Sequence, residues 1–542
     1  MRLILLSGGS GKRLWPLSNE IRSKLFLKLL PAPDGTLESM MQRLCRQLRE
    51  EGLLEGAVIV THRSQAEITR AHAGADVPIV EEPAKRGTFT AAALGAAYLA
   101  GPGRAPEDEA VCVLPVDLFV EADFLALLRR LPEALARGAD LGMIGTEPTH
   151  PSAQYGYIVP IREPRPRRPK RRAAAGGRKF GGMTDAGAGA GAGERAARPD
   201  ADAGADGAGV GKSAARPDAD AGADGAGVGR SAARPDADAG GNGARAGRNA
   251  APPGADAGAD GAGAGWLPVG RFAEKPDPPA ATRLIKQGGL WNSGVFVFRL
   301  GWLLGQLQAR GYPSSLPELL RGYDEWSEKS FDQELAEKAS RSLVLRYAGS
   351  WKDLGSWSTF LSQLGEAQLG PGAVSAGARN THLINELGCP IHVIGISDAV
   401  VAASPDGILV ASKEHSDRIK EALRELPGLP MQEEKRWGSC RTLEIDRLSG
   451  GGQVLTRRVA VHAGKCTSYH LHEGKEEVWT VLSGEGRFML EDEIYPIGPG
   501  SVMRFPPGSR HGVKAVTELQ CMQVEIGRVL DERDIERLLM SW

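Results

Sequence analysis

One long stretch of the chain, residues 173–265, constrains the fold more than any other feature. Its 93 residues include 25 Gly and 32 Ala, and Phe180 is its only aromatic residue. An 18-residue unit, AARPDADAGADGAGVGKS, occupies 196–213, recurs almost unchanged at 214–231 and decays at 232–249. A stacked solenoid is the alternative interpretation of such repeats, but they carry almost no large apolar residue to stack. Because this composition cannot offset its ordering entropy, we predict a disordered insertion over 163–266.

The remainder of the chain fits two folded domains and a connector, and its composition excludes several classes of protein. The 66 Lys and Arg balance 67 Asp and Glu, which argues against nucleic acid as a main partner. Six Cys do not make a disulfide scaffold. No apolar run approaches the roughly 20 residues that a bilayer requires, and the N-terminal run is too short for a signal peptide. We therefore expect a cytoplasmic protein without a membrane partner. The sequence leaves its oligomeric state open, including a homo-oligomer.

A glycine-rich turn follows the first apolar run. LLSGGSGKRLWPLS covers 5–18, and the run Leu3–Leu6 before the glycines predicts a buried strand. Glycines after a strand let backbone N–H groups approach phosphate oxygens, and Lys12 and Arg13 add charged donors. The pattern is neither a Walker A loop nor GxGxxG. On its own it favours a nucleotide phosphate site, with a structural turn as the alternative.

Seven ordered motifs give this turn a context. They are GGSGKRLWPLS with SKLFLKL (23–29), EEPAKRGT (81–88), VLPVDLFV (113–120), QYGYI (154–158), FAEKP (272–276), WNSGVFVF (291–298) and WKDLGSW (351–357). Together they resemble the sugar-phosphate nucleotidyltransferases, and the Trp15 variant resembles the mannose-1-phosphate guanylyltransferase branch. The resemblance implies a Rossmann-like α/β domain with a mixed sheet, which the insertion divides into 1–162 and 267–365.

The resemblance also implies a reaction, in which GMP passes from GTP to mannose 1-phosphate to give GDP-mannose and pyrophosphate. Two anions must approach each other, so positioning and charge neutralisation dominate such catalysis. The residues implied as catalytic are Arg13, Lys24, Asp117, Lys275 and Asp353, of which Asp117 and Asp353 would hold Mg²⁺. Those implied for the nucleotide are Leu6, Gly8, Gly9, Gly11, Lys12, Arg13, Pro83, Arg86 and Thr88. Those implied for the sugar are Tyr155, Gly156, Glu274, Asn292 and Gly294.

The last part of the chain carries the spacing of a metal site. Gly464, His470, His472, Glu477 and Gly484 form G-x5-H-x-H-x4-E-x6-G, and Gly500, Pro506, Gly508 and His511 form G-x5-P-x-G-x2-H. These are the two cupin motifs. The alternation in His-Leu-His places both imidazoles on one face of a strand. We predict that His470, His472, Glu477 and His511 bind Zn²⁺ or another divalent transition metal.

This C-terminal part, 431–542, resembles the β-barrel cupin domain of type II mannose-6-phosphate isomerases fused to long guanylyltransferases. Residues 366–430 resemble their connector, a short left-handed β-helix. The resemblance implies a second activity, the isomerisation of mannose 6-phosphate and fructose 6-phosphate.

Two departures from the family pattern keep alternatives open. Gly87 replaces the family's Asn, and HLHEGKEEVW has four residues between His472 and Glu477, where the fused isomerases have two and an Arg. The alternatives are another sugar-1-phosphate nucleotidyltransferase, or a sugar-nucleotide sensor or scaffold without catalysis. The cupin could also bind metal without acting as an isomerase.

Overall fold

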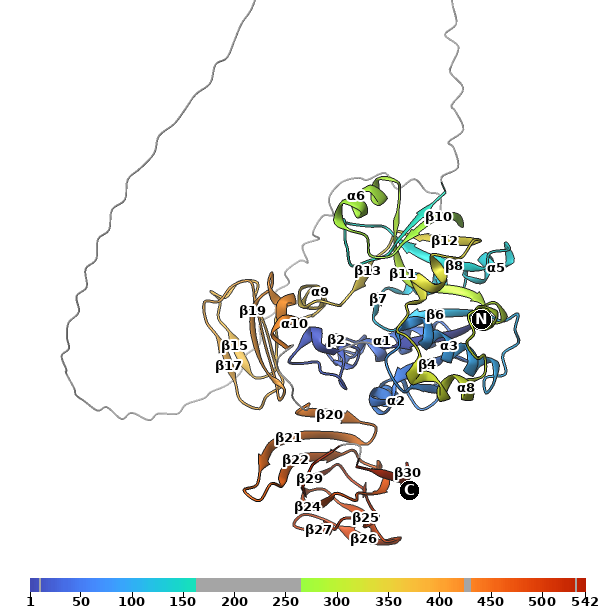
Figure 1. Ribbon diagram of the computed structural model, residues 1–542. Coiled ribbons are helices and arrows are strands. Elements are labelled where there is room, and N and C mark those ends of the chain that lie inside the picture. The colour runs from blue at the N-terminus through green and yellow to red at the C-terminus, as the bar shows by residue number, and fades with distance from the viewer. Residues whose placement is uncertain (9–10, 162–264, 424–429, 532–533) are drawn as a thin grey trace, which may run out of the picture. The chain divides into compact units, whose positions relative to one another are not determined.

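The computed structural model describes residues 1–8, 11–161, 265–423, 430–531 and 534–542 (Figure 1). Apart from Gly265 and Trp266, the insertion predicted over 163–266 lies outside the described residues. Among the helices that are described, none has the length and the apolar content needed to cross a membrane.

A nine-stranded mixed sheet forms the centre of the N-terminal α/β domain. Its order is β5-β4-β1-β6-β11-β8-β12-β10-β9. The strands are β1 (Arg2–Ser7), β4 (Val58–His62), β5 (Ile79–Glu82), β6 (Ala110–Pro115), β8 (Leu141–Thr146), β9 (Tyr157–Pro160), β10 (Leu267–Ala273), β11 (Leu290–Arg299) and β12 (Ser342–Tyr347). β1 lies parallel to β4 and β6, and β11 lies antiparallel to β6. The first residues of β11 therefore lie at the edge where β1 and β6 end.

Side chains alternate between the two faces along each strand. Because apolar side chains lie on both faces of this sheet, helices cover both. In β1, Leu3 and Leu5 belong to one apolar cluster and Ile4 to another. The first cluster includes residues of α1 (Met40–Glu50), α4 (Ala122–Leu128) and α5 (Pro132–Ala136). The second includes residues of α3 (Gly87–Ala100), α7 (Leu300–Gln308) and α8 (Leu316–Arg321). The sheet is thus buried on both sides, and its strand ends are left to carry polar groups.

Two pairs of strands bring distant motifs together. β7 (Leu118–Val120) lies antiparallel to β13 (Trp351–Asp353), with Asp353 opposite Leu118. β9 and β10 lie antiparallel, from Tyr157 opposite Ala273 to Pro160 opposite Val269. The chain that joins β9 to β10 is the long glycine- and alanine-rich stretch. The insertion therefore interrupts the hairpin of β9 and β10, and β9 pairs on its other side with the first residues of β11.

The connector consists of short strands in two ladders. β14 (Gln368–Leu369), β16 (His382–Asn385) and β18 (Ala399–Ser404) pair in parallel, and β19 (Gly407–Ser412) pairs antiparallel to β18. β15 (Gly372–Val374) and β17 (Ile391–Val393) form a second parallel pair. The left-handed β-helix expected for 366–430 stays a prediction.

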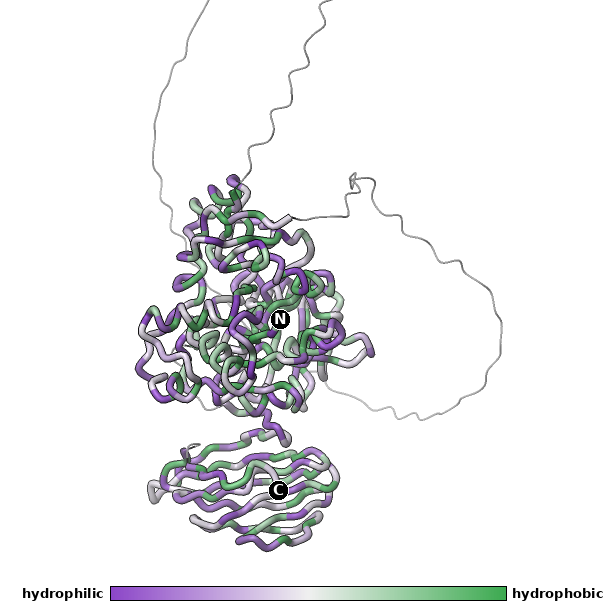
Figure 2. Tube along the Cα trace, turned by 90° about the vertical axis from the view of Figure 1, so that its right-hand side faces the viewer, coloured by the Kyte–Doolittle hydropathy of each residue, from purple (hydrophilic) through white to green (hydrophobic). Residues whose placement is uncertain are grey.

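The C-terminal domain consists of two antiparallel sheets. One has the order β20-β21-β22-β29-β24-β27 and the other β26-β25-β28-β23-β30. The strands are β20 (Gln432–Lys435), β21 (Gly438–Arg447), β22 (Gln453–Val461), β23 (Tyr469–Leu471), β24 (Lys475–Ser483), β25 (Gly486–Leu490), β26 (Glu493–Ile497), β27 (Val502–Phe505), β28 (His511–Ala515), β29 (Leu519–Gly527) and β30 (Glu536–Leu539). Apolar and polar positions alternate along many of them (Figure 2). The buried positions form one core that includes Val459, Trp479 and Phe505.

Candidate functional site

Lys24 connects the two aspartates that the sequence assigns to a metal. Its ammonium nitrogen lies 3.0 Å from Asp117 Oδ2 and 3.2 Å from Asp353 Oδ1. Burial alone would lower the pKa of Lys24, but the two carboxylates outweigh burial and raise it. Asp117 follows the buried strand β6, and the pairing of β7 with β13 places Asp353 nearby. Three of the five predicted catalytic residues therefore lie in one cluster.

Arg13 and Tyr155 border the same cluster. A Cβ atom added to Gly355 would lie 2.7 Å from Arg13 Nη1 and 2.9 Å from Asp353 Oδ1, so the guanidinium and the carboxylate meet across this glycine. Burial, with the charge of Asp353 in second place, raises the pKa of Tyr155 to about 12. The Tyr155 phenol is therefore neutral at physiological pH.

Lys275, the fifth predicted catalytic residue, points elsewhere. Its ammonium lies 2.6 Å from Glu274 Oε1, and its side chain is 62% exposed. It therefore neutralises a residue of the predicted sugar subsite.

The predicted nucleotide residues lie on the strand ends and turns around this edge. Leu6 belongs to β1, and Gly8 is exposed directly after it. Gly9 and the side chain of Lys12 lie outside what the structure describes. Gly11 is held against the Asn19 carbonyl, where a Cβ would lie only 1.9 Å from the oxygen. Pro83 follows β5.

Arg86 and Thr88 form hydrogen bonds with a segment that is distant in the sequence. The Arg86 guanidinium donates to the Asp324 carbonyl, and Thr88 Oγ1 accepts a hydrogen bond from the Phe331 N–H at 2.9 Å.

Gly87 has a steric reason to replace the family's Asn. Its φ is +86°, a conformation that favours glycine. A Cβ here would lie 2.2 Å from the Lys329 carbonyl oxygen and 2.8 Å from its carbon. The close approach of this backbone therefore accounts for the departure from the family pattern.

The five predicted sugar residues lie around the start of β11. The Asn292 N–H donates to the Gly156 carbonyl at 2.8 Å, and the Gly294 N–H donates to Asn292 Oδ1 at 3.0 Å. A Cβ on Gly156 would lie 2.5 Å from Glu274 Oε2 and 3.5 Å from Asn292 Nδ2. The Tyr155 ring contacts the rings of Trp291 and Trp351, with centroids at 4.9 and 5.3 Å. This group combines aromatic faces with hydrogen-bonding groups.

The motifs missed two acidic residues of this group. Asn292 Nδ2 donates to Asp332 Oδ1 at 2.7 Å, and the Glu274 N–H donates to Glu337 Oε1 at 3.1 Å. Both acids lie in FDQELAEK (331–338), where no residue spacing in the sequence singles them out.

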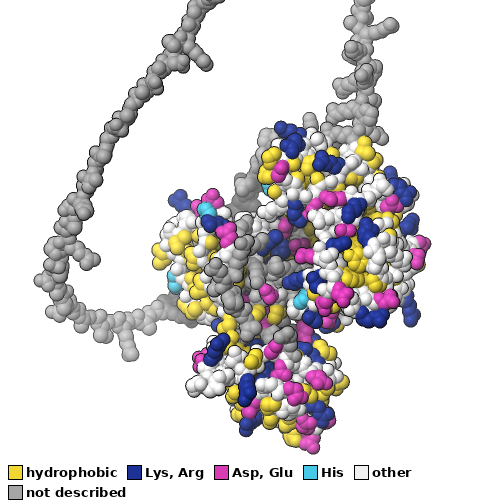
Figure 3. Space-filling model, in the orientation of Figure 1, with side chains coloured by type: hydrophobic (Ala, Val, Ile, Leu, Met, Phe, Trp, Pro, Cys, Tyr) yellow, Lys and Arg dark blue, Asp and Glu magenta, His cyan; other side chains and the backbone are white. Residues whose placement is uncertain are grey.

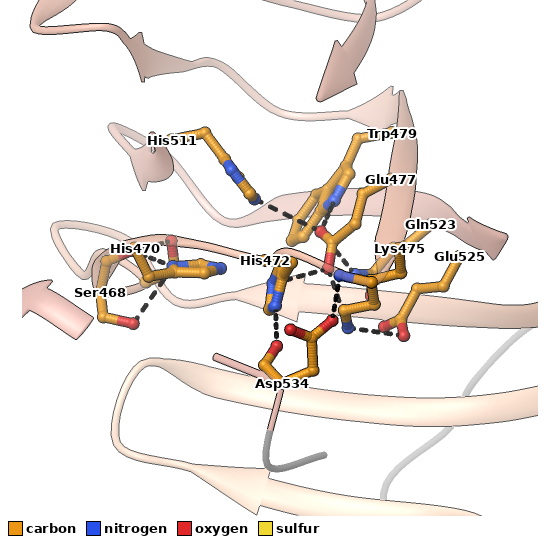
Figure 4. A network of polar contacts seen from close by, with 12 residues as sticks. Ser468, His470, His472, Lys475, Glu477, Trp479, His511, Gln523, Glu525 and Asp534 are labelled. Atoms are coloured by element: carbon orange, nitrogen blue, oxygen red, sulfur yellow. Dashed lines mark hydrogen bonds and ion pairs between the residues drawn. The ribbon is translucent and has the colours of Figure 1, made fainter. Parts of the chain in front are cut away.

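Three histidines meet inside the C-terminal domain (Figure 4). His470, His472 and His511 are buried, and they can present nitrogen atoms within 4.8 Å of one another. His470 of β23 lies directly opposite His511 of β28 in the strand register. The predicted alternation of His-Leu-His brings His472 to the same place.

Backbone carbonyls orient the three rings. The Nδ1 atoms of His470 and His511 lie 2.7 Å from the Ser468 carbonyl and 3.0 Å from the Ser509 carbonyl. His472 Nδ1 contacts the Asp534 carbonyl. A carbonyl can only accept, so each Nδ1 carries a proton, and in a neutral ring the Nε2 atom then keeps a lone pair for a ligand. His511 Nε2 is buried and has no hydrogen-bond partner among the described residues.

Glu477 contacts two of these histidines. Its Oε1 lies 3.1 Å from His472 Nε2, and its Oε2 lies 3.6 Å from His511 Nε2. Lys475 also lies 3.1 Å from Oε1, and Trp479 and Gln523 donate to Oε2 at 2.9 and 3.0 Å. Burial would raise the pKa of Glu477, but the close contacts with His472 and His511 and the charge of Lys475 hold it well below its usual range.

The histidine cluster has the properties that a divalent transition metal requires. Burial, followed by the proximity of His511, lowers the pKa of His470 to about 3, so this imidazole is neutral at pH 7. Neutral imidazoles with carbonyl-bound Nδ1 atoms are the usual form of histidine ligands. The three rings and the ionised Glu477 fit a cation in this domain.

Comparison with known proteins gives the two parts a class. The Nucleotidyl transferase family model matches residues 2–165, and the Cupin domain model matches residues 457–527. The fold and its two polar sites therefore define a nucleotidyltransferase joined to a C-terminal cupin domain.

Curated relatives match over the full chain. The chain is 25% identical to the alginate biosynthesis protein AlgA of Pseudomonas aeruginosa, over 99% of this chain and 95% of that protein. It is 24% identical to the mannose-1-phosphate guanylyltransferase RfbM of Salmonella typhimurium, over 99% and 96%. The chain is therefore similar, over its full length, to mannose-1-phosphate guanylyltransferases and related polysaccharide biosynthesis proteins.

A solved structure supports the fold. The mannose-1-phosphate geranyltransferase from Thermus thermophilus has a TM-score of 0.51 and 22% identity, and the match covers 78% of this chain and 98% of that one.

Proposed function

We propose that the α/β domain transfers GMP from GTP to mannose 1-phosphate, giving GDP-mannose and pyrophosphate. The cluster of Lys24, Asp117 and Asp353 carries this proposal, since it joins three motifs of the family at one edge of the sheet. The match to the nucleotidyl transferase family model supports the reaction class, and the mannose and guanine preferences rest on the similarity to guanylyltransferases.

In the proposed reaction, an oxygen of the sugar phosphate attacks the α-phosphorus of GTP. The bond from that phosphorus to the oxygen bridging to the β-phosphorus breaks, and pyrophosphate leaves with the electron pair. Arg13 and Lys24 would neutralise charge on the phosphates. Asp117 and Asp353 would hold Mg²⁺, which when bound supplies further neutralisation of the phosphate oxygens. No residue needs to form a covalent bond to the nucleotide.

A substrate screen tests this proposal. Pyrophosphate release is measured with Mg²⁺, each of the four NTPs and the 1-phosphates of mannose, glucose and galactose. We expect kcat/KM for GTP with mannose 1-phosphate to exceed every other pair by at least about tenfold. Preference for another pair would contradict the assigned substrates. Release from no pair would contradict nucleotidyl transfer and favour a sensor or scaffold. One reason for the sensor or scaffold alternative was that Gly87 departs from the family pattern. The close approach of the Lys329 backbone explains this glycine sterically, so it no longer supports that alternative.

We propose a second, metal-dependent activity in the cupin domain, the interconversion of mannose 6-phosphate and fructose 6-phosphate. The three oriented imidazoles beside Glu477 support a metal site, with Zn²⁺ or another divalent transition metal as its occupant. Isomerisation moves a proton between C1 and C2 of the sugar, and a bound metal would polarise the oxygens there. Protein loaded with Zn²⁺, Mn²⁺, Fe²⁺ or Co²⁺ is incubated with fructose 6-phosphate and assayed for mannose 6-phosphate. Stoichiometric metal without isomerisation would contradict this activity and leave a binding domain.

A further inference from the structure

Asp332 is the first residue of a short helical turn, η5 (Asp332–Ala336). The segment directly before it is hydrogen-bonded to the backbone and side chains around the predicted nucleotide residues. The Lys329 N–H donates to the Arg86 carbonyl at 3.0 Å, and the Phe89 N–H donates to the Lys329 carbonyl at 3.2 Å. The Phe331 N–H donates to Thr88 Oγ1. The backbone before Asp332 is therefore fixed from one side of the site, while its side chain reaches the other side.

On that other side, Asp332 fixes the orientation of the Asn292 side-chain amide. The two ends of the Asn292 side chain have nearly the same shape, so only their partners decide which end is oxygen and which is nitrogen. The Gly294 N–H fixes the oxygen end at 3.0 Å, and Asp332 Oδ1 fixes the nitrogen end at 2.7 Å. An ionised carboxylate only accepts hydrogen bonds, so it holds the donor end toward itself.

The amide so oriented keeps a second N–H on Nδ2. Gly156 has no side chain to cover this nitrogen or Glu274 Oε2, since a Cβ would lie 3.5 and 2.5 Å from them. A donor and an acceptor side by side match a hydroxyl group, which both accepts and donates. Glu274 is paired with Lys275, so its charge is balanced even though Asp332 lies nearby.

We propose that Asp332 is a positioning residue of the sugar subsite, which fixes the Asn292 amide so that Nδ2 and Glu274 together bind one hydroxyl of the sugar 1-phosphate. The inference rests on the proposed nucleotidyl transfer, and it adds a residue that the family motifs do not include. Asp332 acts through Asn292 and need not touch the substrate.

Steady-state pyrophosphate release from the full chain tests the role of Asp332. In Asp332→Ala, we expect KM for mannose 1-phosphate to rise at least about tenfold, as for a lost hydrogen bond to a charged group, with KM for GTP within about twofold of wild type. Asp332→Asn retains an oxygen acceptor and should keep both KM values within about threefold. Gln333→Ala, an exposed position in the same turn, is the matched control and should behave as wild type.

Each contrary result has a separate meaning. An unchanged sugar KM in Asp332→Ala, an equal rise in both KM values, or the same defect in Asp332→Asn would overturn the positioning role. A wild-type chain that releases no pyrophosphate from any NTP and sugar 1-phosphate would instead refute the proposed function. Calorimetric binding of mannose 1-phosphate to each variant separates weakened binding from a damaged fold.

Discussion

Each of the two candidate sites brings side chains of one kind close together, aspartates in one and histidines in the other, and the two sites stabilise them in different ways. In the α/β domain, Asp117 and Asp353 are 41% and 27% exposed, and a lysine of the chain itself neutralises them. In the cupin domain the histidines and Glu477 are buried, and backbone carbonyls orient the rings. The first site is balanced by a side-chain charge near solvent, whereas the second is fixed by the strands before any ligand binds.

The surrounding surface does not separate the domains in the same way. Basic and acidic side chains are interspersed over the visible face (Figure 3). The difference between the sites is therefore local, and substitutions at each should act independently.

The largest effect is expected at the aspartates. Asp117→Asn or Asp353→Asn removes one carboxylate from the proposed Mg²⁺ site and should lower kcat for pyrophosphate release by about 10²–10³-fold. Asp108→Asn, an exposed acid in the loop before β6, should leave the rate unchanged. Metal bound by the cupin domain should be the same in all three variants. Wild-type turnover in either site variant would refute the metal assignment.

A smaller, separate effect is expected at the histidines. His511→Ala removes one of the three buried imidazoles and should reduce tightly bound transition metal at least about tenfold by elemental analysis, since the loss of even an outer-shell partner of a ligand typically weakens metal affinity about 10–100-fold. His462→Ala, an exposed histidine of the same domain, is the control. Nucleotidyl transfer should stay within about twofold in both. A coupled loss of transfer activity would show that the two sites are not independent.

The glycine that departs from the family offers a third test. Gly87→Asn restores the family residue but forces its Cβ against the Lys329 carbonyl, which should destabilise the protein by about 1–3 kcal/mol and weaken GTP binding. Gly35→Asn is matched, because Gly35 has φ +84° and nothing within 4 Å of its added Cβ. Thermal unfolding and KM for GTP are measured for both. If Gly87→Asn were neutral or tightened GTP binding, the steric explanation would fail.

The smallest expected effect is a pH dependence. Burial, then the charge of Glu274, raises the pKa of Asp332 to about 6, and Asn292 and Lys275 oppose this rise. The folded state therefore holds this proton more tightly than the unfolded state, and wild type loses stability as pH rises from about 4 to 6. Asp332→Asn cannot ionise, so its Tm should gain a few degrees on wild type over that range and stay level above it. A constant difference across the whole range, from acid to neutral pH, would refute the raised pKa.

Sequence patterns predicted those site residues whose type and spacing are characteristic of a particular chemistry. The glycine turn, the aspartate after VCVLPV and the His-Leu-His alternation each have a spacing with a physical meaning. The structure brings Asp117 and Asp353 together at Lys24, and it brings the histidines together in the cupin domain. The mixed α/β sheet and the C-terminal β domain were expected from the resemblance to known families rather than from spacing.

The other contacts of the two sites have no recognisable pattern in the sequence. The carbonyls of Ser468, Ser509 and Asp534 orient histidines through backbone atoms, which every residue type possesses. Asp332 meets Asn292 from 40 positions away, inside a segment whose charges look like any solvated helix. Only the path of the backbone at Lys329 explains why position 87 is a glycine. These contacts depend on how segments meet in space, which residue types alone do not specify.

The hairpin of β9 and β10 has a consequence for how the chain folds. A turn of a few residues would let these strands pair early, but here they must find each other across more than one hundred residues. Loop-closure entropy makes this pairing costlier by about 2–3 kcal/mol than closing a turn of about five residues. The pairing of β9 with β10 should therefore form late, after the parallel core of β1, β4 and β6. A chain shortened within 173–265 should reach its native state faster while keeping the same sheet.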